Sequence, residues 1–250
     1  HVDVWSANGR KNLFGQPVKL VEMQSEGGAI GAVHGASETG SLCSSFTASQ
    51  GLMLMIPVMH RLSGELKPVV LHIAARTVGT HTMSIFGDHS DVMGCRNTGW
   101  AMLCSASVQE CADLAAVAHL STIKGRVPFM HFFDGFRTSH EIQKIKMLPA
   151  EELGKLIDRD ALYHFKHTGL NPEHPVMRST VTNPDMFFQS REANNPWYQR
   201  LPYIVQDYMD QISELTGRPY HLFDYYGAPD AEHVVIAMGS VTGAIQAAAF

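Results

Sequence analysis

The pattern of apolar and polar residues along the chain predicts short strands that alternate with helices. Apolar and polar residues alternate at 18–23, and residues 68–75 are apolar almost throughout, as in a strand buried on both faces of a parallel sheet. Strands are predicted at residues 18–23, 43–46, 68–75, 100–104 and 127–133. Helices are predicted at residues 27–40, 52–62 and 108–124. This order predicts an α/β fold with an open parallel sheet.

The amino-acid composition of the chain changes after about residue 149. Residues 150–205 are polar and rich in turns, with three Asn-Pro pairs, and a helix is predicted at 203–216. A strand at 232–237 and a helix at 241–250 are then predicted, and together they resemble an incomplete βα unit. We therefore expect a first domain over 1–149, a connecting arm over 150–224 and the truncated start of a second α/β domain over 225–250.

Composition excludes several classes of protein. Hydrophobic residues make up 45% of the chain and charged residues 17%, which argues against disorder. The formal net charge of -5 provides no basic excess for binding nucleic acid. No apolar run reaches the ~18–20 residues of a membrane span. The chain begins at His1 rather than Met, so a preceding targeting segment stays an open alternative.

The four cysteines do not form a recognisable metal-binding pattern. Cys43, Cys95, Cys104 and Cys111 include no CxxC pair, and their spacing fits neither a zinc site nor a ferredoxin-type cluster. We expect buried free thiols in a reducing compartment.

Glu26 is the first candidate for chemistry. It follows the predicted strand 18–23 and precedes a glycine-rich helix, so it lies at the carboxyl edge of the sheet, where ligands bind in open α/β folds. A partly buried carboxyl group there can hold a proton and donate it to a ring nitrogen. The alternative is a first-turn glutamate that only favours the helix dipole. The spacing of Gly27, Gly31 and Gly35 predicts that this helix packs closely against another backbone or a ligand.

Arg76 is the second candidate, because it ends the apolar strand 68–75 and faces the same edge. A guanidinium group matches a carboxylate bidentately. The alternative is a salt bridge at the surface or between domains.

The remaining motifs are less informative. His81, Asp88, His89 and Asp91 superficially resemble a metal cluster, but their spacing matches no standard zinc pattern, and we interpret residues 87–91 as a loop with capping acids, without a metal. No phosphate-binding loop and no G-x-S-x-G occur, and residues 27–31 do not match G-x-G-x-x-G. A dinucleotide site therefore has no support from motifs.

A series of longer blocks resembles one enzyme family. The blocks are 22–26 (EMQSE), 31–36 (GAVHGA), 46–52 (FTASQGL), 72–76 (HIAAR), 84–91 (SIFGDHSD), 131–141 (HFFDGFRTSHE), 170–175 (LNPEHP) and 225–231 (YYGAPDA). In this order they resemble the N-terminal part of the pyruvate:ferredoxin (flavodoxin) oxidoreductases, over nearly all 250 residues.

The resemblance implies a thiamine-diphosphate and iron–sulfur enzyme that oxidatively decarboxylates pyruvate with coenzyme A. Acetyl-CoA, CO2 and electrons for ferredoxin or flavodoxin are the implied products. Residues 1–149 resemble most of the thiamine pyrimidine-binding domain, and 225–250 the opening of a transketolase C-terminal-like domain. The Mg²⁺, diphosphate and [4Fe-4S] ligands are implied to lie in other regions, so this chain alone is expected to be inactive. A homodimer is implied, with a cytoplasmic location, or a hydrogenosome or mitochondrion-related organelle in an anaerobic protist.

The resemblance also implies roles for the two candidate residues. Glu26 matches the glutamate that hydrogen-bonds the thiamine pyrimidine, and Arg76 the arginine that binds the pyruvate carboxylate. Three alternatives stay open: a pyruvate:NADP⁺ oxidoreductase, an enzyme for a larger 2-oxoacid, and a non-catalytic interaction domain. Retention of Glu26 and Arg76 argues against the last.

Overall fold

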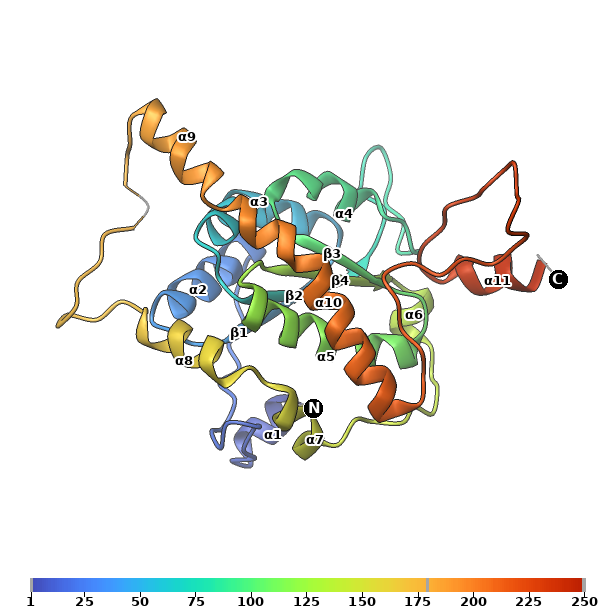
Figure 1. Ribbon diagram of the computed structural model, residues 1–250, viewed down its shortest axis with the longest axis horizontal. Coiled ribbons are helices and arrows are strands. Elements are labelled where there is room, and N and C mark those ends of the chain that lie inside the picture. The colour runs from blue at the N-terminus through green and yellow to red at the C-terminus, as the bar shows by residue number, and fades with distance from the viewer. Residues whose placement is uncertain (1, 179, 249–250) are drawn as a thin grey trace.

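The computed structural model describes residues 2–178 and 180–248 and is built around a parallel sheet (Figure 1). Its strands are β1 (Cys43–Thr47), β2 (Val69–Ala75), β3 (Ala101–Ser105) and β4 (Phe129–Asp134). They are ordered β1-β2-β4-β3, and all neighbouring pairs are parallel. The predicted α/β class is confirmed, as are four of the five strands predicted in the first 149 residues.

Helices connect the strands, and the later part of the chain is almost entirely helical or irregular. The helices are α1 (Val2–Ala7), α2 (Glu26–Glu38), α3 (Ser49–Gly64), α4 (Ser90–Gly94), the 3-10 turn η1 (Arg96–Thr98), α5 (Val108–Gly125), α6 (Arg137–His140), α7 (Ala150–Leu156), α8 (Arg159–His167), α9 (Pro184–Glu192), α10 (Asn195–Thr216) and α11 (Val241–Ala248).

The sheet is covered on both faces, which explains the apolar character of β2. Val69, Leu71 and Ile73 point toward the face packed by α2 and α3, whereas Val70 points toward the face packed by α5. Helix α10 packs in turn on α5, where Val205, Met209 and other apolar residues complete the second core. The alternation of side chains along each strand thus divides the buried residues into two cores, one on each face.

Two predicted strands do not form. Residues 18–23 and 232–237 are irregular, and their apolar side chains are largely exposed. A strand is stabilised by hydrogen bonds to a neighbour, and neither segment lies beside a partner strand in the described part of the chain. An alternating or apolar pattern predicts the capacity to form a strand but does not supply this partner.

The glycine-rich helix α2 is less tightly packed than its sequence suggests. A Cβ atom on Gly27 would lie 3.7 Å from the carbonyl oxygen of Leu54 in α3, an ordinary contact. Apart from the backbone of α2 itself, no atom in the described part of the chain lies within 4 Å of a Cβ placed at Gly31 or Gly35. At Gly31 and Gly35 the prediction of packing against another backbone is therefore wrong, whereas packing against a ligand stays a prediction.

The segment beyond residue 149 partly leaves the body of the molecule. Figure 1 shows residues 171–178, residues 180–183 and α9 extending on one side, and residues 221–248 on the other. The helix predicted at 203–216 begins earlier, at Asn195, with Pro196 in the first turn, where proline is tolerated. Residues 249–250 of the predicted helix 241–250 lie outside the described residues, and the expected domain boundaries stay predictions. Within residues 2–178 and 180–248, no helix combines the length and apolarity needed to cross a bilayer.

Candidate functional site

The carboxyl ends of the four parallel strands define one edge of the sheet. Thr47, Ala75, Ser105 and Asp134 are the last residues of β1 to β4. Open α/β sheets bind ligands at this edge, because the loops that leave parallel strands surround a crevice there. Arg76 belongs to this end of the fold because it follows β2, as we predicted, whereas Glu26 reaches it through its contact with the first turn of α3, since the strand predicted at 18–23 does not form.

Glu26 is the first residue of α2 and is only partly exposed. Its side chain lies against the first turn of α3. A Cβ atom on Gly51 would stand 2.7 Å from both Cγ and Oε1 of Glu26, so the two helices approach each other at a residue without a side chain. The carboxyl group is thereby held beside the backbone of α3.

Arg76 directly follows β2 and is partly buried. Gly135 lies against its side chain, because a Cβ atom there would stand 2.6 Å from Cγ of Arg76. The Nε atom of Arg76 is buried and has no hydrogen-bond partner in the described part of the chain. Leaving such a donor unsatisfied costs about 1–3 kcal/mol or more, so this N–H group is suited to donate to a water molecule or to a bound anion.

Asp91 connects Arg76 to the start of α3. Its side chain is 0% exposed, and its Oδ2 atom accepts hydrogen bonds from the backbone N–H of Ser49 at 2.9 Å and of Arg76 at 3.0 Å. Its Oδ1 atom accepts from the N–H of Val92 at 2.7 Å. Burial raises the pKa of the Asp91 carboxyl, although these N–H groups favour the charged form. Sequence reasoning treated Asp91 as a loop acid, because its partners are far away along the chain.

Asp88 and His89 of the same loop also make structural contacts. Asp88 accepts from the N–H of Ser90, the first residue of α4, at 2.6 Å. Nε2 of His89 lies 2.7 Å from Asp134, which also accepts hydrogen bonds from the backbone and hydroxyl of Ser240. Asp134 therefore joins the end of β4 to the loop and to the start of α11.

A hollow of about 300 Å³ lies beside the edge, on the α5 face of the sheet. It is lined by Phe46, Thr47, His72, Ala74, Val108, Cys111, Phe133, Thr138 and Ser139. The hydroxyls of Thr47 and Thr138 are buried and have no partner among the described residues. Neither Glu26 nor Arg76 lines this hollow, so we do not assign it to the same site.

A chain of histidines lies behind the hollow. His72 is within hydrogen-bond distance of His131 (2.9 Å) and His119 (3.2 Å), and His131 contacts the Ser105 hydroxyl at 2.7 Å. Burial, with mutual repulsion, lowers the pKa of His72 to about 3, and burial lowers those of His119 and His131 to about 4. The three rings are therefore neutral at pH 7 and form a polar link between α5 and the sheet.

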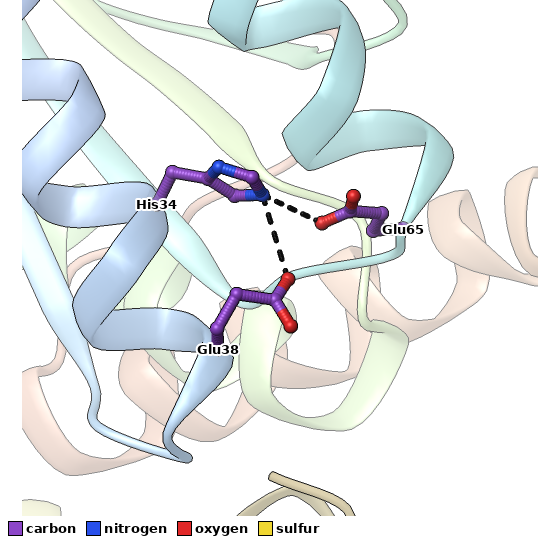
Figure 2. Close-up of side chains that lie close together, drawn as sticks. All are labelled: His34, Glu38 and Glu65. Atoms are coloured by element: carbon purple, nitrogen blue, oxygen red, sulfur yellow. Dashed lines mark hydrogen bonds and ion pairs between the residues drawn. The ribbon is translucent and has the colours of Figure 1, made fainter. Parts of the chain in front are cut away.

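One group in the described part of the chain has side chains arranged so that they could hold a metal ion. His34 and Glu38 on α2 and Glu65 after α3 point toward one another (Figure 2). Nε2 of His34 lies 2.8 Å from Glu65 and 3.4 Å from Glu38. The sequence analysis did not single out these residues, because Glu65 is distant along the chain.

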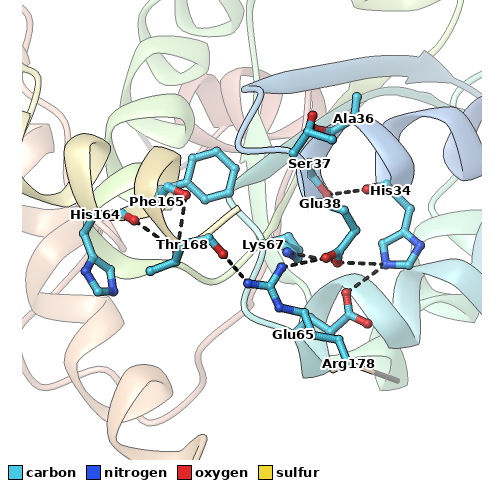
Figure 3. Close-up of polar contacts among 11 residues, drawn as sticks. His34, Ala36, Ser37, Glu38, Glu65, Lys67, His164, Phe165, Thr168 and Arg178 are labelled. Carbon is cyan, nitrogen blue, oxygen red and sulfur yellow. Dashed lines mark hydrogen bonds and ion pairs between the residues drawn. The ribbon is translucent and has the colours of Figure 1, made fainter. Parts of the chain in front are cut away.

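Two cations already neutralise this group. Lys67, 4% exposed, places Nζ 2.9 Å from Glu38, and Nη1 of Arg178 lies 2.6 Å from the same carboxylate (Figure 3). Arg178 also donates to the carbonyl of Thr168. Two carboxylates facing two cations leave no negative charge for a divalent ion, so we interpret the group as an ion-pair network that fastens the 171–178 segment to α2.

We expect Glu38→Gln to destabilise the chain by roughly 3 kcal/mol at pH 7, because Lys67 would be left buried without its partner. Burial alone would raise the pKa of Glu38, but hydrogen bonds with Glu65, Lys67 and Arg178 outweigh it and lower the pKa to about 2. The charged form therefore contributes stability above about pH 4.5, and this contribution is lost as the pH falls toward 2.

Urea unfolding followed by circular dichroism between pH 2 and 7 measures this effect. The difference between wild type and Glu38→Gln should shrink as the pH falls. Glu152→Gln is the control, because Glu152 pairs with an exposed Lys155 and should contribute less than about 0.5 kcal/mol. Equal effects of the two substitutions at pH 7 would contradict the assignment.

All four cysteines are free, as predicted. Cys95 is buried and the others are partly buried. Burial raises the pKa of the Cys104 and Cys111 thiols to about 12, so neither is a reactive thiolate at neutral pH.

Comparison with known families defines the class of protein to which this fold and site belong. Residues 1–210 match the family model described as pyruvate flavodoxin/ferredoxin oxidoreductase, thiamine diphosphate-binding. The chain belongs to this family.

Individual relatives agree with this assignment. The chain is 61% identical to pyruvate-flavodoxin oxidoreductase of Klebsiella pneumoniae over 98% of its length, and 61% identical to pyruvate:ferredoxin oxidoreductase of Moorella thermoacetica over 95%. It is 53% identical over 95% of its length to the mitochondrial pyruvate dehydrogenase [NADP(+)] of Euglena gracilis. It spans 21%, 20% and 13% of these three relatives, respectively.

Proposed function

We propose that the chain is the thiamine pyrimidine-binding part of an enzyme that oxidatively decarboxylates pyruvate with coenzyme A. The products would be acetyl-CoA, CO2 and electrons for ferredoxin or flavodoxin. The observation that carries the proposal is the buried, unpartnered Nε of Arg76 at the carboxyl edge of the sheet. Membership of the family and the names of the relatives support the reaction class.

Arg76 would bind the carboxylate of the 2-oxoacid. A guanidinium group offers parallel N–H donors that match two carboxylate oxygens, and the partly buried position strengthens the attraction. Because Asp91 holds the backbone N–H of Arg76, the base of this side chain is fixed before substrate arrives. Arg76 would thus orient the keto carbon of the substrate.

Glu26 would hold a proton against a ring nitrogen of the thiamine pyrimidine. Thiamine diphosphate, when bound, supplies the nucleophilic carbon that adds to a keto group. The residues present fit this role, because Glu26 lies at the start of α2 with its carboxyl group against Gly51, which has no side chain, and is only partly buried. The carboxyl group positions and shares the proton, as a general acid and base does.

Other parts of the whole protein would supply the remaining components. The sites for the diphosphate, Mg²⁺, [4Fe-4S] clusters and coenzyme A belong to those parts, and the enzyme would be a homodimer. The Euglena relative favours a second candidate, in which NADP⁺ accepts the electrons. A cytoplasmic or organellar location stays a prediction.

The test is an assay of the full-length enzyme for reduction of a low-potential viologen with pyruvate and coenzyme A. Activity that needs both compounds and thiamine diphosphate is the expected result. Replacing viologen by ferredoxin, flavodoxin or NADP⁺ then identifies the acceptor. Activity only with a larger 2-oxoacid would retain the chemistry and reject pyruvate, whereas no activity with any 2-oxoacid would favour an interaction domain.

A further inference from the structure

The first turn of α3 meets Glu26 at Gly51, where a side chain would compete for the space that Glu26 occupies. Gly51 is buried and does not have a positive φ, so its backbone conformation is open to other residues. A Cβ atom there would nevertheless stand 2.7 Å from both Cγ and Oε1 of Glu26, closer than a Cβ atom approaches its neighbours in real proteins. The missing side chain at Gly51 is therefore what permits the observed orientation of Glu26.

The same turn is attached to Arg76. Ser49 has a φ of 50°, a left-handed conformation that is unfavourable for most residues other than glycine and is retained where surrounding contacts enforce it. Its N–H donates to Oδ2 of Asp91, and its hydroxyl donates to the carbonyl of Thr77 at 2.8 Å. The N–H of Arg76 donates to the same Oδ2 atom, so one buried carboxylate oxygen fixes the separation of the two backbones.

We propose that the Ser49–Gly51 turn and Asp91 form a positioning device that sets Glu26 and Arg76 relative to each other. Gly51 leaves the space that orients Glu26, and Asp91 ties the turn to Arg76. Both are positioning residues, since each acts through another residue. The inference rests on the proposed function, because it concerns the presentation of these side chains to the thiamine pyrimidine and the 2-oxoacid.

The central experiment is Gly51→Ala in the full-length holoenzyme. Glu26 would have to leave its orientation, so kcat should fall by about 10- to 100-fold, and the Kd of the apoenzyme for thiamine diphosphate, measured by titration calorimetry, should rise about tenfold. KM for pyruvate and the unfolding temperature should change little, since alanine favours helix more than glycine does. Gly64→Ala is the matched control, because Gly64 ends the same helix, and a Cβ atom there would lie within 4 Å of no described atom outside the backbone of its own helix.

Asp91→Asn tests the link to Arg76. The asparagine amide has one acceptor oxygen in place of two. Its NH₂ group is a donor and cannot accept a hydrogen bond from a backbone N–H. We expect a rise of about tenfold in KM for pyruvate together with a lower kcat, a split that Gly51→Ala does not show. Asp88→Asn is the control, because Asp88 accepts from Ser90 in the same loop but does not contact Ser49 or Arg76.

The outcomes separate this inference from the proposed function. Unchanged kcat and cofactor affinity in Gly51→Ala would overturn it, as would an equal loss in Gly64→Ala or a failure of Gly51→Ala to fold. If Asp91→Asn does not fold, the kcat and cofactor affinity of Gly51→Ala decide whether the inference holds. A wild-type enzyme inactive with 2-oxoacids would refute the proposed function, whereas cofactor affinity would still test the effect of Gly51 on Glu26.

Discussion

Glu26→Gln should lower kcat of the full-length enzyme by about 10³-fold, the middle of the range expected when a group that transfers protons is removed. Glutamine preserves the size of the side chain but cannot exchange a proton with a ring nitrogen. The loss should therefore appear in kcat rather than in KM for pyruvate. Steady-state viologen reduction at saturating thiamine diphosphate, pyruvate and coenzyme A measures it.

Glu22→Gln is the matched control for this substitution. Glu22 is exposed, lies four residues before Glu26 and precedes α2, so its replacement should leave kcat within a factor of two. The unfolding temperature of Glu26→Gln should remain close to that of wild type, because Glu26 is only partly buried. A Glu26→Gln enzyme with wild-type kcat would reject the cofactor assignment.

Arg76→Ala should lower kcat/KM for pyruvate by about 10²- to 10³-fold, mainly through a higher KM. Two charge-assisted hydrogen bonds to a carboxylate contribute about 1.5–3 kcal/mol each, and part of this is recovered by solvation of the free substrate. Arg76→Lys retains the charge but loses the planar fork, so it should fall between alanine and wild type. Initial rates over a range of pyruvate concentrations measure both variants.

Arg61→Ala is the control for a general loss of positive charge. Arg61 lies on α3 and is exposed, so its removal should leave KM for pyruvate unchanged. If Arg76→Ala and wild type share the same KM, Arg76 does not bind the substrate, and its buried Nε needs another explanation. Full activity of Arg76→Lys would show that charge alone suffices.

Features that depend on residues close together in the sequence were predicted well. The apolar run at 68–75 became β2, and the periodic segment at 108–124 became α5, which ends at Gly125. The position of Arg76 at the end of a strand followed directly from β2, and that of Glu26 beside the start of a helix followed from the predicted helix at 27–40, although the strand predicted before it does not form. Local propensity and side-chain periodicity decide such features, because each depends on a few consecutive residues.

The failures have a common physical cause. Residues 18–23 and 232–237 carry the pattern of strands but lie beside no partner strand, and Gly31 and Gly35 face open space rather than another backbone. The pattern along one segment predicts which secondary structure that segment can form. Whether it forms depends on hydrogen-bond partners and packing surfaces that come from elsewhere.

The amino-acid sequence by itself determined the α/β class, most of the elements, and the two residues at the carboxyl edge of the sheet. Only the tertiary structure decided how those residues are held: Gly51 against Glu26, and Asp91 between Ser49 and Arg76. It also decided that Glu38 meets Arg178, 140 residues away. Contacts of this kind join segments distant along the chain, and no local pattern records them.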